Sequence, residues 1–131
     1  MASELSNYLA NAILGWVSGS AMPSEPSDVY VALFDGDPTA TGSGGTEVTT
    51  DIRPAGRVAV SWGSVSGREI ANNADVDFGV ADSAADVTHA AIFDAASAGN
   101  MLMYSPVDNV RNILQGDPVV IPSGDLRANF N

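Results

Sequence analysis

Residue types that support common protein chemistry are absent or nearly so. The 131 residues include no cysteine and no lysine, and His89 is the single histidine. Without cysteine the chain forms no disulfide, thiolate nucleophile, cysteine-ligated zinc site or iron–sulfur cluster. One histidine excludes a metal site built from several imidazoles. We therefore expect no metal and no other cofactor.

Long apolar runs and positive charge are also scarce. No apolar run reaches the ~20 residues of a transmembrane helix, and the first residues lack the basic region of a secretory signal. Five arginines stand against 16 acidic residues, which gives a net charge of −11. So few cations cannot neutralise many phosphates, and an anionic membrane would repel this surface. We expect neither nucleic acid nor a membrane as a partner.

The remaining composition is that of one folded domain. Hydrophobic residues make up 45% of the chain, too many for intrinsic disorder, and the length fits a single domain. Two explanations of the acidity stay open. One is a saline source, and the other is solubility together with repulsion of unwanted contacts.

One helical pattern lies at the N-terminus, over residues 4–18. Apolar residues recur at helical spacing and form one stripe. These residues are Leu5, Tyr8, Leu9, Ala12, Ile13 and Trp16. Ser3 is the expected N-cap, with Glu4 at the positive end of the helix dipole, and Gly19 ends the helix. The stripe packs either on its own domain or on a neighbouring subunit.

Beyond a Ser- and Pro-rich linker at residues 20–28, the hydrophobic period changes from 3.6 to 2. Short strands are expected at 29–34, 57–62, 76–80, 87–93, 101–104, 119–121 and 126–130. Residues 105–116 are expected to be irregular or extended. About seven short strands with no helices between them predict a mainly β fold, a β-sandwich or jelly roll with one N-terminal amphipathic helix. The single domain 1–131 then comprises helix 1–19, linker 20–28 and sandwich 29–131.

Several residues could carry chemistry, and each has a simpler structural explanation. Asp35 and Asp37 could share a calcium ion, but Asp-Gly-Asp-Pro is also a turn that ends a strand. His89 lies within a strand, where a structural role is expected. The serines lack the Gly-x-Ser-x-Gly pattern of a hydrolase, and Gly42–Gly45 lacks the lysine of a phosphate-binding loop.

We therefore expect no catalytic, cofactor-binding or metal-binding residues. A small carbohydrate-active enzyme is a remote alternative, because the fold sets the spacing of a carboxylate pair. Aromatic residues make up only 7% of the chain, few for a sugar groove, and Trp16 and Trp62 are expected in the core.

Almost the whole chain resembles a family of small virion proteins of tailed phages, described as tail-fibre or minor structural proteins. The matching stretches are 5–14, 29–34, 44–48, 57–60, 87–94, 99–104 and Gly116–Asp117. The sequence departs from the family pattern before Arg57, where the usual aromatic residue is missing.

The resemblance implies a non-enzymatic β-sandwich that assembles on a virion. Two roles are open: a decoration or cement protein on the major capsid protein, and a tail-fibre or host-recognition component bound to tail proteins. Because the chain is too short for a fibre shaft, we expect the capsid surface. Leu9, Ile13, Trp16 and Val17 offer more apolar area than a lone terminal helix needs, and we therefore expect a homotrimer. The N-terminal helix and a flexible, nearly uncharged loop at residues 39–50 are the expected contact sites.

Overall fold

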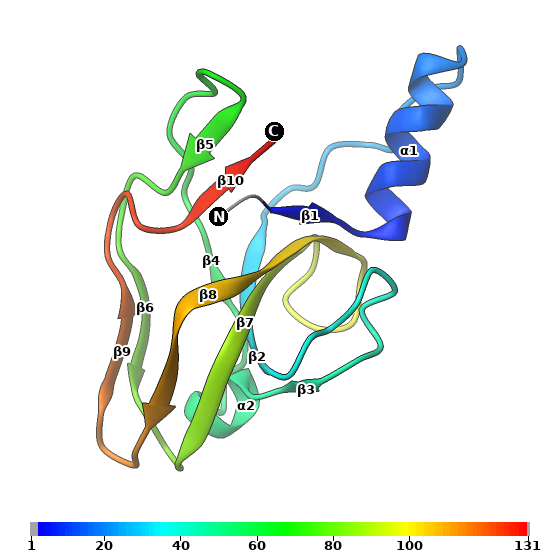
Figure 1. The fold of residues 1–131 in the computed structure, drawn as a ribbon. Coiled ribbons are helices and arrows are strands. Elements are labelled where there is room, and N and C mark those ends of the chain that lie inside the picture. The colour runs from blue at the N-terminus through cyan, green and yellow to red at the C-terminus, as the bar shows by residue number, and fades with distance from the viewer. Residues whose placement is uncertain (1–2, 131) are drawn as a thin grey trace.

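Strands dominate the computed structural model, which describes residues 3–130 (Figure 1). The elements are β1 (Glu4–Leu5), α1 (Asn7–Val17), β2 (Tyr30–Asp35), β3 (Thr46–Glu47), α2 (Thr49–Ile52), β4 (Val58–Ala59), β5 (Glu69–Ala71), β6 (Val76–Val80), β7 (Ala85–Phe93), β8 (Met101–Ile113), β9 (Pro118–Ile121) and β10 (Arg127–Asn129). The mainly β fold expected from the sequence is confirmed. The second helix, α2, was not expected.

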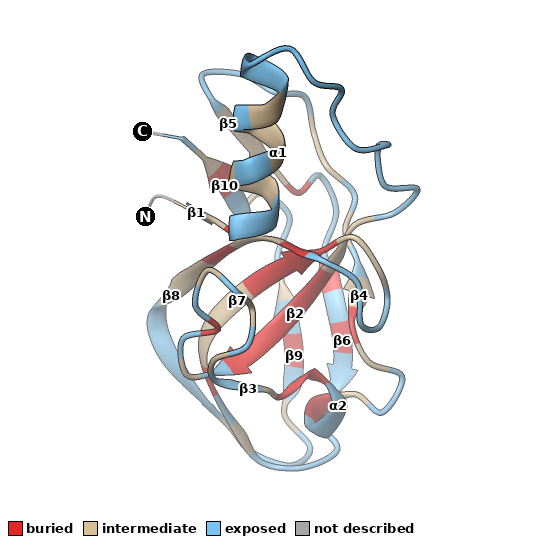
Figure 2. Cartoon of the chain, turned by 90° about the vertical axis from the view of Figure 1, so that its right-hand side faces the viewer, coloured by how far each residue is buried: buried red, intermediate tan, exposed pale blue. Residues whose placement is uncertain are grey.

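The first layer is a six-stranded antiparallel sheet with β2 at its centre. Its order is β1-β8-β7-β2-β3, and β4 also pairs with β2. β2 is buried on both faces, as its uninterrupted apolar run predicts (Figure 2). β7 and β8 form an antiparallel hairpin.

Two small sheets, β6–β9 and β10–β5, form the second layer. The main core lies between these layers. Its buried members are Val31, Leu33, Val48, Ile52, Val76, Phe78, Ala81, Val87 and Val119. Alternation along β6 places Val80 on the same face as Val76 and Phe78, but Val80 is 64% exposed. A bulge between Asp77 and Gly79, where Gly79 has φ +80°, shifts the register of β6.

A second, smaller core lies on the opposite face of the large sheet. It contains Ala32, Phe34, Ala91, Phe93, Met101 and Tyr104. The segment between β2 and β3 packs over it: Pro38 is fully buried, and Ala40 packs against the cluster. The expectation of a free, flexible loop at residues 39–50 is therefore wrong. This loop closes a core, and its last residues form β3 and the start of α2.

β8 is much longer than the expected strand at 101–104. It continues to Ile113 and follows β7 along its whole length. Between the pairs His89–Pro106 and Val87–Arg111, β8 carries extra residues that bulge out of the ladder. The sequence there is polar, and most of these residues are exposed, which hides the strand pattern.

The N-terminal helix begins later than expected. Glu4 and Leu5 form β1, which pairs with Tyr104 and Met103 of β8, so neither residue is helical. The N-cap is Ser6, whose buried hydroxyl accepts a hydrogen bond from the Leu9 amide at 3.1 Å. Residues 20–28 contain no helix or strand and are exposed.

Candidate assembly surface

Helix α1 is held to the body of the protein at its first turn. The Ser6 amide donates to the carbonyl of Leu102 at 3.0 Å, and the Asn7 amide donates to that of Ala40 at 2.8 Å. Leu9 and Ile13 are half-buried, and no residue of α1 is fully buried. The helix then extends away from the sheets (Figure 1). Its last turn is left without a covering element.

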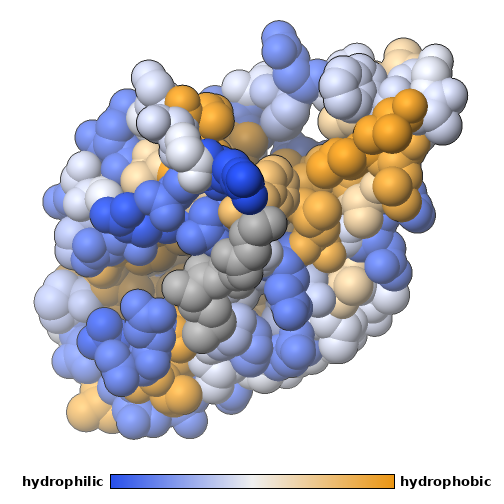
Figure 3. All heavy atoms as spheres, turned by 45° about the horizontal axis from the view of Figure 1, so that its top comes forward, coloured by the Kyte–Doolittle hydropathy of each residue, from blue (hydrophilic) through white to orange (hydrophobic). Residues whose placement is uncertain are grey.

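That last turn exposes three large apolar side chains. Leu14, Trp16 and Val17 are 65%, 62% and 70% exposed. At 100° per residue the three positions span an arc of about 160°, with Leu14 and Val17 one turn apart, so nearly half of the circumference of the tip is exposed and apolar. We call these three residues the knob. Figure 3 shows a hydrophobic patch over α1, among more hydrophilic neighbours.

The knob also lies in an uncharged part of a highly charged chain. No charged residue occurs between Glu4 and Glu25, although the whole chain carries a net charge of −11. Met22, in the following linker, adds a further exposed apolar side chain. An exposed patch of this kind marks an interaction site.

A groove of about 760 Å³ opens into the main core on another side of the molecule. β8, β9 and β10 supply most of its lining, and β2, β5 and β7 contribute further residues. Its aliphatic residues include Ala90, Val107, Ile113, Val119, Ile121 and Leu126. Its rim carries Glu69, Asp108, Arg111, Asp125 and Arg127. Only two residues of β1 pair with the outer edge of β8, so the two layers remain open along the rest of that edge.

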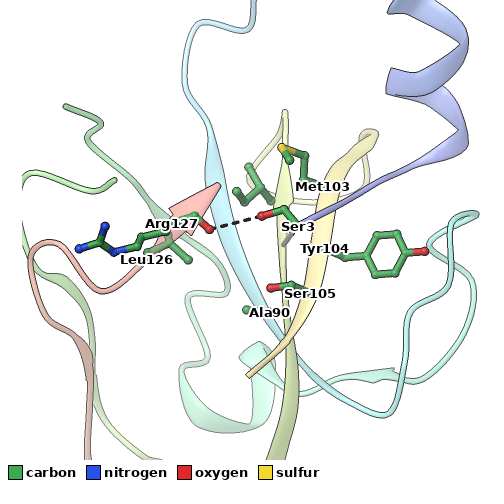
Figure 4. A pocket seen from close by; sticks show the side chains of 8 residues that line it. Ser3, Ala90, Met103, Tyr104, Ser105, Leu126 and Arg127 are labelled. Atoms are coloured by element: carbon green, nitrogen blue, oxygen red, sulfur yellow. Dashed lines mark hydrogen bonds between the residues drawn. The ribbon is translucent and has the colours of Figure 1, made fainter. Parts of the chain in front are cut away.

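Ser3 lies above the groove and connects the layers. Its amide donates to Oδ1 of Asn129 at 3.1 Å, and its hydroxyl donates to the carbonyl of Arg127 at 3.3 Å (Figure 4). Beneath it lies a cavity of about 20 Å³, whose lining includes Ala90 and Ser105, residues that also line the groove. The Tyr104 side chain points away from this cavity.

The candidate calcium ligands form a turn. Oδ1 of Asp37 accepts a hydrogen bond from the Thr39 amide at 2.8 Å, as an Asx turn does. Over residues 3–130, no group of three or more His, Asp or Glu side chains is arranged to hold a metal ion. The Asp-Gly-Asp-Pro sequence therefore forms the turn that ends β2, which was the alternative to a calcium site.

His89 takes part in sheet packing. It lies on β7 opposite Phe34, and its Nδ1 is 2.8 Å from the hydroxyl of Thr88. That hydroxyl accepts a hydrogen bond from the Gly36 amide at 2.7 Å. The imidazole thus belongs to a network that joins β7 to the end of β2.

Neither tryptophan is buried in the core, contrary to expectation. Trp16 belongs to the exposed knob, and Trp62 is half-buried beside Asn72, with which it forms an isolated bridge. The helical spacing of Trp16 correctly indicates a helix face. The spacing alone cannot show that Trp16 lies past the part of the helix that packs on the domain.

The groove was not apparent from the sequence. Its walls come mainly from three consecutive strands, but each of these belongs to a different sheet, and its apolar residues look like ordinary core positions. The polar stretch of β8 was the available signal, because a long polar strand is typical of a sheet edge. None of the helices in the described part of the chain is long and apolar enough to cross a membrane.

Comparison with protein-family models identifies the family. A family model described as "Podophage GP4 fiber I protein gp80" matches residues 4–129, which is nearly the whole chain. No curated protein matches the sequence. The matched region includes α1, the groove and both layers of the sandwich.

Proposed function

Because the chain belongs to the Podophage GP4 fiber I protein gp80 family, we propose that this phage virion structural protein is a subunit of a tail fibre. The family match, which spans residues 4–129, carries the proposal. The exposed knob supports it, since a fibre subunit must bind neighbouring chains. This reading replaces the capsid cement role favoured by the sequence, because the family is named for a fibre.

The ordered loop at residues 39–50 also favours this choice. In the cement interpretation, that loop was a free segment able to order against the major capsid protein. Instead it packs over Phe34 and Met101 and is committed to the fold of its own domain. Helix α1 remains as the better contact site of the two.

We propose a homotrimer assembled through α1. Burying a large apolar side chain contributes ~1.5–3 kcal/mol, so covering Leu14, Trp16 and Val17 provides a substantial driving force. Uncharged α1 also brings acidic copies together without placing carboxylates against one another. The role is binding and architecture without catalysis: Asp37 and His89 make turn and sheet contacts.

Gene deletion in the phage tests the location and role. Particles without the chain should adsorb poorly to host cells, while their heads resist heating and osmotic shock as well as wild-type heads do. Gold-labelled antibody against the chain should mark the tail, at a few to a few dozen copies per particle. Normal adsorption with fragile heads and several hundred copies on the capsid would restore the cement role.

Light scattering tests the assembly. We expect three times the 13.4 kDa chain mass for the wild type. Trp16→Ala should weaken the assembly and leave the fold of the monomer intact, because the side chain is 62% exposed. A wild type that is monomeric in solution and occurs as single, unclustered copies on purified particles would contradict the trimer.

A further inference from the structure

We propose that the knob of one copy inserts into the groove of the next copy, so that three such contacts close a ring. This inference rests on the proposed fibre function and specifies how its subunits meet. Each copy contributes one knob and one groove. A contact between two different surfaces of identical chains is heterologous, and it closes into a ring when the rotation between neighbours permits.

The shape of the knob calls for a concave receptor. Leu14, Trp16 and Val17 are exposed and spread over an arc of about 160° of the helix tip. A single helix lying alongside makes a narrower seam and would leave part of this arc in water. The groove of about 760 Å³ is concave and leads to aliphatic core residues. Its volume lies in the range of about 300–1,000 Å³ that is typical of binding pockets.

The outer edge of β8 disfavours an added strand as occupant of the groove. Pro106 has no amide hydrogen to donate, and the bulge between Pro106 and Arg111 interrupts the ladder. Both features protect sheet edges from pairing with another strand. A helix satisfies its own backbone hydrogen bonds and needs only apolar contacts. Helix α1 of a second copy meets that requirement.

Charge also favours a second copy of α1. The groove rim carries Glu69, Asp108 and Asp125, so an acidic segment would be repelled there. Residues 5–24 carry no charge. The C-terminal end of a helix has partial negative charge, and α1 has no basic residue in its last turn. The exposed Arg111 on the rim supplies a cation for that end.

The knob does not fill the groove of its own chain. α1 is anchored on β1, β8 and the Ala40 segment, and its tip points away from β9 and β10 in both ribbon views (Figures 1 and 2). The two surfaces therefore lie on different parts of one copy. Their contact requires another molecule.

Two variants separate the surfaces. The knob variant carries Leu14→Glu and Val17→Glu, both at exposed positions. The groove variant carries Arg111→Glu and Val120→Glu, also at exposed positions that line the groove. Ala90→Trp is a second groove variant that fills the space instead of changing its charge. Val65→Glu, at a position 77% exposed and outside both surfaces, is the control.

Light scattering should show a trimer for the wild type and for the control. Each knob or groove variant alone should be a monomer, with a circular dichroism spectrum like that of the wild type. An equimolar mixture of the knob variant and either groove variant should form a dimer, because one intact knob and one intact groove remain. No further copy can then add to this dimer.

Other outcomes overturn the inference in distinguishable ways. If both groove variants stay trimeric while the knob variant is monomeric, α1 meets something other than the groove, and the α1-mediated trimer still stands. If the mixture gives no dimer, the contact is not heterologous. If the knob variant stays trimeric, both this inference and assembly through α1 fail.

Discussion

Arg57 is a buried cation beside the second core. Its guanidinium donates from Nε and Nη2 to the two carboxylate oxygens of Glu47, at 3.0 and 2.9 Å. Nη1 donates to the carbonyls of Ala95 and Ala98, at 2.9 Å each. The guanidinium also lies 3.6 Å from the ring centroid of Phe93. One side chain thus connects β3, the turn after β7 and the aromatic cluster.

Arg57→Met should therefore lower the free energy of unfolding by about 2–4 kcal/mol, because it leaves a carboxylate and two carbonyls without their partner. Urea denaturation measures the change. Arg127→Met is the matched control: the Arg127–Glu69 pair is exposed, and its loss should cost about 0–1 kcal/mol. Equal losses in the two variants would show that burial adds nothing at Arg57.

Tyr104 makes stability sensitive to high pH. Burial, helped by a hydrogen bond to Glu4 and by the charges of Glu4 and Asp37, raises its pKa from 10.0 to about 12. Between pH 10 and 12 the unfolded chain loses this proton while the folded chain keeps it. Stability should therefore be fully present below pH 10 and fall as the pH rises toward 12.

Urea denaturation at a series of pH values between 8 and 12 measures this loss. Tyr104→Phe, which cannot ionise, should show a smaller decline than the wild type over the interval from pH 10 to 12. Identical pH profiles for both proteins would mean that Tyr104 does not contribute to the alkaline loss.

At the scale of elements, local patterns identify types better than boundaries. The 3.6-residue period predicts α1, and the apolar run predicts β2. Leu5 also fits the helical stripe, yet it belongs to β1, because pairing with Met103 of β8 satisfies its backbone. A pattern within one segment cannot include a partner almost 100 residues away. The same limit hides the groove, because β8, β9 and β10 each belong to a different sheet, whose other strands lie earlier in the chain.

The loop between β2 and β3 shows this limit most clearly. Its Gly, Ser and Thr content suggests mobility, whereas its glycines allow tight packing. A Cβ on Gly45 would lie 2.6 Å from the carbonyl oxygen of Gly36, and one on Gly44 would lie 2.5 Å from that of Asp37. Two stretches of backbone meet there, and the loop closes over the second core.

Gly45→Ala should destabilise the protein by more than the ~1–2 kcal/mol of left-handed strain alone, because the clash with Gly36 adds to it. Gly67→Ala provides the matched control. Its φ is +60°, against +62° for Gly45, but no atom lies within 4 Å of the added Cβ. Thermal melts compare the two. Equal decreases in Tm would show that the close approach has no energetic role.

At the scale of the whole molecule, the distribution of charge matters more than its total. The net charge of −11 opposes compaction and association, while α1 and the linker up to Ser24 remain neutral. Two ion pairs, Arg57–Glu47 and Arg127–Glu69, offset part of the repulsion within the described residues. Arg68 forms no ion pair within those residues.

This charge imbalance predicts that salt stabilises the protein. From about 0.01 M to 0.15 M ionic strength the screening length falls from about 30 Å to about 8 Å, so repulsion between distant carboxylates weakens. Tm should rise over this interval, and the trimer should dissociate less on dilution. Asp28→Asn together with Asp82→Asn removes two exposed charges from outside the knob and the groove, so this variant should gain less from salt.

A Tm that falls with added salt would mean that the two ion pairs, which salt also screens, outweigh the repulsion. The knob itself carries no charge, so the main effect of salt on assembly is to screen the repulsion between acidic copies, and added salt should strengthen assembly even in that case.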